Sequence, residues 1–266
     1  MSCCSKKEEV QEYYGKELQS SADLKTNTCQ IAQEEMTGLI KKIRSLLHDD
    51  TLASFYGCGS PIPPALNGAV VLDLGCGSGV DVFVCSALVG DGGKVIGVDM
   101  TEEQLAKANK HVQYHFEKFK EAGYISKLNV EFKKAFIEDL SFIPDNSVDV
   151  IISNCVINLS SDKSKVFKEC HRILKKGGEL YFSDVYASKR IPLELQNDKV
   201  LWGECLSGAM YVEDFRRALE KSGFTDHRIC SSSIITLNNP LIQKQVGDIV
   251  FYSNTVRAFK LDLEDR

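Results

Sequence analysis

Ten cysteines are distributed along the 266 residues, and four of them fall between segments that we expect to form helices and strands. These four are Cys29, Cys58, Cys155 and Cys205. A cysteine thiolate can act as a nucleophile, exchange with a disulfide or bind a soft metal or metalloid. None of the four has the C-x-x-C spacing of a structural zinc site. Spacing alone leaves a chemical role and simple packing about equally open.

We assign no chemistry to the other six cysteines, which are Cys3, Cys4, Cys76, Cys85, Cys170 and Cys230. Three of these lie within apolar helical or strand patterns, where cysteine acts as a small hydrophobic residue of the core. One lies in a glycine-rich turn, where its small size explains it. The remaining two are close to the N-terminus, where we expect no function.

A glycine-rich turn is the second feature with chemical meaning. Gly75, Gly77 and Gly79 allow a tight turn and a close approach of a ligand to the backbone. A dinucleotide-binding turn, G-x-G-x-x-G, would place its third glycine at position 80, where this chain has Val80. The sequence therefore argues against NAD. The G-x-G-x-G form, with Asp73 ahead of it, resembles motif I of class I methyltransferases, whose ligand has no pyrophosphate.

An acidic residue follows the turn at a separation in sequence that is typical of a ribose-binding carboxylate. Asp99 ends the second expected strand, twenty residues after Gly79, where a carboxylate can accept hydrogen bonds from both ribose hydroxyls. Ile137 and Glu138 follow the third expected strand, where methyltransferases of this class commonly contact adenine. A glycine-rich turn in another kind of α/β protein is the alternative. The order strand, turn, helix, strand and acid favours the methyltransferase.

Alternating strands and helices must position these groups. The expected strands are 69–74, 94–99, 130–133, 148–153 and 179–185. The expected helices between them are 79–89, a helix opened by a Thr101–Gln104 capping box, and 162–174, which ends at a basic turn and two glycines. This alternation predicts a parallel sheet with helices on both faces. Outside it we expect helices at 8–18, 37–48 and 214–222, an irregular stretch at 201–211 and β-like runs up to residue 260.

Composition limits the class of protein. The chain is 43% hydrophobic and 26% charged, which is ordinary for a soluble globular protein. A net charge of -5 and a pI of about 5.6 argue against nucleic acid or an anionic membrane as the main partner. No apolar run approaches the roughly 20 residues that span a bilayer, and the N-terminus lacks the apolar core of a signal peptide. We therefore expect a cytoplasmic monomer with cysteines in the thiol form.

Several sequence blocks between about residue 10 and residue 260 resemble the arsenite methyltransferase family. The blocks are 13–15 (YYG), 21–24 (SADL), 56–59 (YGCG), 99–101 (DMT), 154–159 (NCVINL), 182–186 (FSDVY) and 201–206 (LWGECL). The NCVINL and LWGECL pair is the most specific, because blocks of that length are not expected by chance in a generic methyltransferase.

The resemblance implies a class I methyltransferase fold, which is a Rossmann-like α/β sheet, with N-terminal helices and a partial C-terminal α/β lobe. We divide the chain into a helical segment with a cysteine loop at 1–68, an S-adenosylmethionine-binding domain at 69–190, and an arsenic-binding segment at 191–266. Family members usually extend further, so we expect the last segment to be truncated. The cofactor-binding residues implied are Tyr56, Asp73, Gly75, Gly77, Gly79, Asp99, Met100, Gln104, Ile137, Glu138 and Asn154.

The resemblance also implies the reaction. Methyl groups pass from S-adenosylmethionine to thiol-bound trivalent arsenic, and mono- and dimethylated arsenicals result. The four cysteines that are essential in the family fall on Cys29, Cys58, Cys155 and Cys205. We expect Cys155 and Cys205 to be the core arsenic ligands and Cys58 the third. We expect Cys29 to join Cys58 in a disulfide that returns two electrons to arsenic, and thioredoxin or glutathione to restore the thiols.

Some residues and the overall function keep alternative interpretations. His111 and His115 have a metal-compatible spacing, but a surface pair is the better interpretation. Trp202 and Tyr56 either enclose the methyl site or belong to the core, and Glu204 either orients the sulfonium or faces solvent. Two rival functions remain. A methyltransferase for an organic small molecule would not need the cysteines, and a protein that only binds arsenic would not need the cofactor site.

Overall fold

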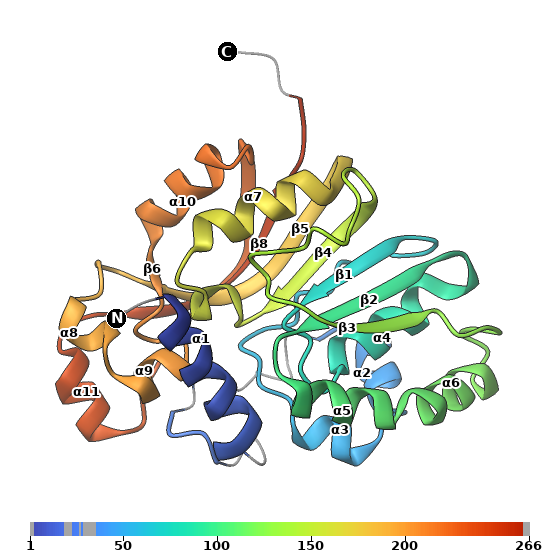
Figure 1. Cartoon of the computed structure of the whole chain (residues 1–266), viewed down its shortest axis with the longest axis horizontal. Coiled ribbons are helices and arrows are strands. Elements are labelled where there is room, and N and C mark those ends of the chain that lie inside the picture. The colour runs from blue at the N-terminus through green and yellow to red at the C-terminus, as the bar shows by residue number, and fades with distance from the viewer. Residues whose placement is uncertain (1–2, 19–22, 27, 29–35, 263–266) are drawn as a thin grey trace.

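The computed structural model describes residues 3–18, 23–26, 28 and 36–262. Within these ranges eight strands form one sheet in the order β3-β2-β1-β4-β5-β8-β7, with β6 beside β5 (Figure 1). The strands are β1 (Val70–Leu74), β2 (Lys94–Asp99), β3 (Val130–Lys134), β4 (Val148–Asn154), β5 (Leu174–Ala187), β6 (Met210–Tyr211), β7 (Asp226–Ile235) and β8 (Phe251–Phe259).

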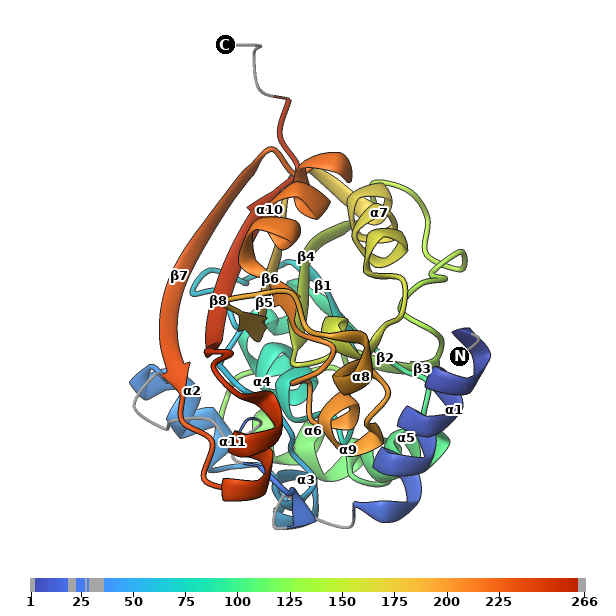
Figure 2. The same cartoon turned by 90° about the vertical axis from the view of Figure 1, so that its left-hand side faces the viewer.

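The first five strands are parallel, as the alternation of strands and helices predicts. Strand β8 runs antiparallel to β5, and β7 runs antiparallel to β8 as the outer strand of the sheet (Figure 2). The sheet therefore continues into the segment after residue 190 without a break. Because parallel strands end at the same edge, the turn after β1, the end of β2 and the end of β4 lie together.

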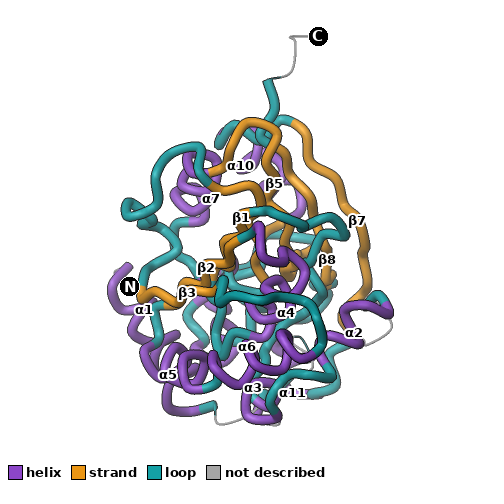
Figure 3. Tube along the Cα trace, turned by 90° about the vertical axis from the view of Figure 1, so that its right-hand side faces the viewer, coloured by secondary structure: helices purple, strands orange, loops and turns teal. Residues whose placement is uncertain are grey.

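Helices cover both faces of the sheet (Figures 1 and 3). One layer contains α2 (Gly38–Arg44), α4 (Val80–Val89), α5 (Glu102–Lys110) and α6 (Val112–Glu121), with the short α3 (Asp49–Ala53) beside α5. The other contains α7 (Lys163–Ile173) and α10 (Val212–Lys221), which pack against each other. Helix α4 is apolar on nearly all sides and almost fully buried, which is expected of a helix covered by both the sheet and α2. Two separate apolar cores result, one on each face.

A third apolar cluster lies at the carboxyl end of the strands and contains Cys58, Cys155 and Cys205. It is enclosed by α8 (Leu193–Gln196), α9 (Lys199–Gly203), α11 (Pro240–Val246), the inner residues of β5 and β8, and the loop that follows Ala53. Helix α1 (Cys3–Glu12) and the π-helical turn η1 (Tyr13–Glu17) run past this end of the sheet, between α9 and α5 (Figure 1). Short 3-10 turns follow α4 (Gly90–Gly92) and β4 (Ile157–Leu159).

Several expected element boundaries are wrong. Residues 175–178 belong to β5 rather than to the last turn of α7, and the pairing of β5 with β4 shifts there to absorb them. The helix expected after Thr101 is divided at His111 into α5 and α6. The β-like run near residue 240 is helix α11, which Asn239 caps. No helix in the described ranges combines the length and apolar character that a membrane span requires.

Candidate active site

The turn between β1 and α4 holds its three glycines in the left-handed region of the backbone. The φ angles are 65° at Gly75, 52° at Gly77 and 87° at Gly79. This conformation is accessible to glycine without steric cost. A side chain at position 75 would also collide with Val156. At position 77 the nearest atom to an added Cβ is Gln104 Oε1, at 3.9 Å, so this side of the turn is open to a ligand.

Asp99 connects the end of β2 to that turn. Its Oδ2 accepts a hydrogen bond from the Gly77 N–H at 2.9 Å, and its Oδ1 accepts one from the Thr101 N–H at 2.8 Å. Asp99 also lines the pocket described below. The expected capping box is wrong, because the described residues give the Thr101 side chain no bond to the first turn of α5. The Gln104 side chain instead donates to the Tyr14 carbonyl at 2.9 Å.

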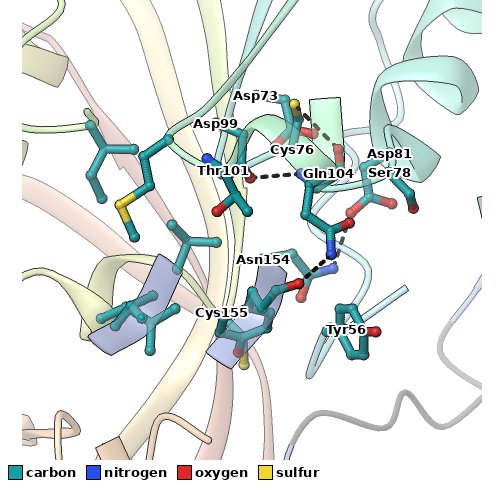
Figure 4. A pocket seen from close by; sticks show the side chains of 18 of the residues that line it. Tyr56, Asp73, Cys76, Ser78, Asp81, Asp99, Thr101, Gln104, Asn154 and Cys155 are labelled. Carbon is teal, nitrogen blue, oxygen red and sulfur yellow. Dashed lines mark hydrogen bonds between the residues drawn. The ribbon is translucent and has the colours of Figure 1, made fainter. Parts of the chain in front are cut away.

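A pocket of about 930 Å³, partly open to solvent, lies at this edge of the sheet (Figure 4). Its lining comes from α1 and η1 (Lys7, Val10, Tyr14), the 54–56 loop (Ser54, Phe55, Tyr56), the β1 turn and α4 (Asp73, Gly75, Cys76, Gly77, Ser78, Asp81), the β2 end and α5 (Asp99, Met100, Thr101, Gln104), the segment after β3 (Ala135, Ile137, Glu138) and the segment after β4 (Asn154, Cys155, Val156, Leu159, Ser160).

Of the predicted cofactor-binding residues, only Gly79 is not part of this lining. Sequence reasoning missed the contribution of the first helix, which places Lys7, Val10 and Tyr14 in the wall. The shared helical face of Val10 and Tyr14 was a usable signal, but nothing local indicates what that face covers. Asp81, one turn into α4, was also missed.

Three predicted sulfur residues meet beside the pocket. Cys58 and Cys155 are joined by a disulfide, with their Cα atoms 5.9 Å apart. The Cys205 Sγ donates a hydrogen bond to the Cys155 carbonyl at 3.0 Å. The sulfur atoms of Cys155 and Cys205 and a carboxylate oxygen of Asp184 all lie within 4.8 Å of one another. The expected partner of Cys58 was Cys29, which lies outside the described residues, whereas its partner in this structure is Cys155.

The backbone is strained at two of these cysteines. The φ angle is 57° at Cys155 and 63° at Cys205, and Asn146 is the other non-glycine residue with a positive φ in the described ranges. Such a conformation costs roughly 1–3 kcal/mol and persists where the surrounding structure enforces it, often at functional sites. Cys155 directly follows β4, and Cys205 lies just beyond α9, so each turn redirects the chain where a sulfur atom is placed.

The histidine pair lies away from this pocket and is not a surface pair. His111 and His115 are both buried, which corrects the expectation of a solvent-exposed pair. The His115 ring packs against Phe83, with ring centroids 3.8 Å apart, and its Nε2 accepts a hydrogen bond from the His48 N–H at 3.1 Å. The His48 and His111 rings are stacked with their centroids 3.9 Å apart, and His111 Nε2 lies 3.2 Å from the Asp50 carboxylate.

Comparison with known proteins decides the family. Arsenite methyltransferase from Aquipseudomonas alcaligenes is 51% identical over 257 residues, which are 96% of this chain and 72% of that protein. Arsenite methyltransferase from Homo sapiens is 44% identical over 254 residues, which are 95% of this chain and 67% of that protein. The chain belongs to the arsenite methyltransferase family. A family model described as a methyltransferase domain matches residues 66–223.

Known structures agree with this family assignment. The crystal structure of an arsenic(III) S-adenosylmethionine methyltransferase from Chlamydomonas reinhardtii is 41% identical, covers 87% of this chain and 76% of its own, and superposes with a TM-score of 0.81. A phosphoethanolamine N-methyltransferase from Haemonchus contortus, 18% identical with a TM-score of 0.55 over 75% of this chain and 50% of its own, shows the fold alone. The predicted class I methyltransferase fold and S-adenosylmethionine cofactor are confirmed.

The electrostatics of the pocket suit the cofactor of the arsenite methyltransferase family. Burial raises the pKa of Asp73 well above its usual range, and the nearby carboxylates Asp81 and Asp99 add to the effect. Burial also raises the pKa of Asp81 and of Asp99, while a hydrogen bond from Asn154 opposes the shift at Asp81. Because S-adenosylmethionine has a positively charged sulfonium, its binding would offset the cost of burying these carboxylates.

Two ionisable side chains, those of Asp184 and Lys163, lie near the cysteines. Burial raises the pKa of Asp184 to about 7, although backbone N–H groups and the Lys163 ammonium oppose the rise. Asp184 accepts hydrogen bonds from the Asn158 side chain at 2.7 Å and from the Val185 N–H at 2.8 Å. Burial lowers the pKa of Lys163 to about 8, while Asp184 and Cys205 act in the opposite direction. The sulfur cluster is therefore next to a carboxylate that the protein holds in place, which no sequence signal indicated.

Glu204 and Trp202 close the site toward α1. Glu204 is fully buried, so the interpretation as a solvent-facing carboxylate is wrong. Its Oε1 accepts a hydrogen bond from the Tyr13 hydroxyl at 2.8 Å, which connects η1 to the end of α9. The Trp202 Nε1 donates to the Leu159 carbonyl at 3.3 Å, and the Lys163 ammonium lies 5.3 Å from the ring centroid. Tyr56 lines the pocket, and burial raises its pKa to about 12.

Proposed function

We propose that this chain methylates trivalent arsenic, with S-adenosylmethionine as the methyl donor and the thiolates of Cys155, Cys205 and Cys58 as the arsenic ligands. One observation carries the proposal. The sulfur atoms of Cys58 and Cys205 both lie close to the sulfur of Cys155, and Cys155 also lines the cofactor pocket. Trivalent arsenic is soft and binds thiolates in preference to oxygen or nitrogen ligands. A thiol cluster beside the methyl donor suits that substrate.

The pocket residues fit the cofactor. The open side of the turn at Gly77 admits a ligand close to the backbone, and the Asp99 carboxylate lines the pocket as the acceptor that we assign to the ribose hydroxyls. Ile137 and Glu138 line the part of the pocket that we assign to adenine. When bound, S-adenosylmethionine supplies a methyl group on a sulfonium sulfur. The lining around it and α1 exclude water, and the cysteines hold the acceptor in line.

The thiolates prepare arsenic as the nucleophile. Two or three sulfur ligands hold trivalent arsenic as a pyramid, which leaves its lone pair free to accept the methyl group. No general base is needed at this step, since no proton leaves the nucleophile. The left-handed turns at Cys155 and Cys205 fix the direction in which the sulfur atoms present arsenic. The contribution of the protein is therefore mainly alignment.

The disulfide supports an assignment of the groups that supply electrons to arsenic after methyl transfer. Methyl transfer leaves arsenic formally pentavalent, and two electrons must return it to the trivalent state. We assign them to Cys58 and Cys155, because the two arsenic–sulfur bonds can break as one sulfur–sulfur bond forms, leaving methylated arsenic(III) on Cys205. A hydroxide ion or the thiolate of glutathione then binds the open position on arsenic and balances its positive charge. Exchange of the Cys29 thiolate into this disulfide would release Cys155. Thioredoxin or glutathione would then restore the thiols.

Mass spectrometry of the arsenic products tests this function. Arsenite, S-adenosylmethionine and a thiol reductant are incubated with the protein, and mono- and dimethylated arsenicals are quantified. Cys205→Ser replaces a soft ligand by a hard one, so methylation should fall to background. Cys230→Ser is the matched control, since that cysteine is exposed on β7 and remote from the cluster in sequence and in the sheet. It should retain wild-type activity.

The other outcomes point to the rival functions. Arsenic capture without methylated product in the wild type would indicate a protein that only binds arsenic. Equal methylation by wild type and Cys205→Ser would show that the sulfur cluster does not hold the acceptor. Either result would overturn the proposal.

A further inference from the structure

Asn154, the last residue of β4, uses all the hydrogen-bonding capacity of its side-chain amide in bonds to other parts of the protein. Its Oδ1 accepts hydrogen bonds from the Cys58 N–H at 3.0 Å and the Gly59 N–H at 3.3 Å. Its Nδ2 donates to the Gly59 carbonyl at 2.9 Å and to Asp81 Oδ2 at 3.1 Å. An amide has two acceptor lone pairs and two N–H donors, so all four are in use. The residue is also 8% exposed, so little of it is available to a ligand.

The bonded segment, 57–59, is the loop that carries Cys58. Both backbone polar groups of Cys58 are held by side chains, since Asn154 accepts from its N–H and the Ser253 hydroxyl donates to its carbonyl at 2.7 Å. The loop is also packed tightly. An added Cβ at Gly57 would collide with the Asn154 side chain, and one at Gly59 would collide with Ser183. The loop therefore lies between the ends of β4 and β8 with its cysteine fixed.

We propose that Asn154 is a positioning residue that holds the Cys58 thiol against Cys155 and so determines how readily these two cysteines form a disulfide. The role of this disulfide in turnover rests on the proposed function above. Cys155 directly follows Asn154, so the end of β4 positions the Cys155 sulfur through the backbone. The same strand end positions the Cys58 sulfur through the side-chain amide of Asn154. The two cysteines are 97 residues apart in sequence. Without the amide, the Cys58 loop would have to be ordered each time the pair forms.

The same geometry changes the role predicted for Asn154. Its sequence position, at the cofactor edge of β4, indicates a cofactor ligand, and it does line the pocket. The amide has no remaining hydrogen-bonding capacity for a ligand, however. Its bond to Asp81 instead connects the pocket wall to the cysteine loop. The proposal therefore predicts that loss of the amide shifts the Cys58–Cys155 disulfide equilibrium even when no cofactor and no arsenic are present.

The test measures the disulfide equilibrium without arsenic. Full-length protein is equilibrated in dithiothreitol redox buffers, alkylated, digested, and assayed by mass spectrometry for the Cys58–Cys155 linked peptides. Asn154→Leu has a similar volume but no amide, and it should shift the equilibrium at least about tenfold toward the dithiol, as expected for the loss of several hydrogen bonds. Asn154→Asp keeps the acceptor but replaces both donor bonds by repulsive contacts with the Gly59 carbonyl and Asp81, so it should also shift the equilibrium toward the dithiol.

Asn129→Leu is the matched control. Asn129 is another buried asparagine, and its amide makes three hydrogen bonds, with Ser86 and Gly90. It directly precedes β3 and so lies at the opposite end of the parallel strands from Cys58 and Cys155. It should lower thermal stability to a similar extent but leave the disulfide equilibrium at the wild-type value. If Asn154→Leu does not fold, as judged by circular dichroism, the Asn154→Asp shift decides the question.

Two outcomes would overturn the proposal. One is a wild-type disulfide equilibrium in folded Asn154 variants. The other is an equal shift in Asn129→Leu. No arsenic is present in these measurements, so they can fail while arsenic methylation stands, and they can succeed if methylation is absent.

Discussion

His115 makes the stability of the fold depend on pH in a way that can be calculated. Its side chain is 1% exposed on α6, against Phe83. Burial lowers its pKa from 6.5 to about 4, and the neighbouring imidazoles of His111 and His48 add to the decrease. The neutral ring accepts a hydrogen bond at Nε2 from the His48 N–H, and protonation at that nitrogen would remove the acceptor. The fold therefore favours the neutral form of His115 over the protonated form.

The direction of the pH dependence of stability follows from the pKa values of His115 in the folded and unfolded states. Because the pKa is lower in the folded state, the unfolded chain binds the proton first as the pH decreases. The contribution of His115 is complete above pH 6.5 and is lost as the pH falls from 6.5 toward 4. The change in pKa corresponds to about 3 kcal/mol in full, of which about 2 kcal/mol should be lost between roughly pH 7.5 and pH 5.

The measurement is urea unfolding of wild type and His115→Gln at several pH values. Glutamine does not titrate, and its side-chain oxygen lies about as far along the chain as Nε2, so the bond to His48 can persist. The buried carboxylates of the pocket have raised pKa values and act in the opposite direction, but both proteins contain them. The difference between the two proteins isolates His115. Parallel stability curves across this pH range would refute the reasoning.

Three further outcomes follow from the site. Asp99→Asn leaves one oxygen for two backbone donors and a ribose, so calorimetry should show S-adenosylmethionine affinity about tenfold weaker or worse, with arsenic capture unchanged. Gly59→Ala should reduce turnover in the arsenic assay far more than cofactor affinity, because its methyl group collides with Ser183 and displaces the cysteine loop. Tyr13→Phe leaves the buried Glu204 without a hydroxyl donor and should cost about 1–3 kcal/mol in urea unfolding, whereas an unchanged midpoint would contradict that bond.

Local features could be predicted because they depend on short stretches of chain. The turn at Gly75, Gly77 and Gly79 has left-handed φ angles, as its glycines indicate, and Asp99 contacts it across two neighbouring parallel strands. Predictions failed where a tertiary contact overrode a local preference. Gln104 has capping-box spacing, but its side chain bonds to the Tyr14 carbonyl because α1 and η1 pack there. His115 has the pattern of a surface residue, yet Phe83 of α4 and the backbone of His48, which lies between α2 and α3, pack against it.

The chemistry of the site could be predicted from the types of residue and from their order along the chain. Glycines, an acid and loop cysteines indicate a methyl donor and a soft acceptor because each type has few chemical roles. Packing decided which sulfur atoms meet, since Cys58, Cys155 and Cys205 come from segments far apart in sequence and converge only when the sheet, α9 and the loop after α3 are assembled. It also decided that Asn154 serves the Cys58 loop and that Asp184 faces the thiols. Short-range preferences are encoded locally, whereas contacts between distant segments exist only once the cores on both faces have formed.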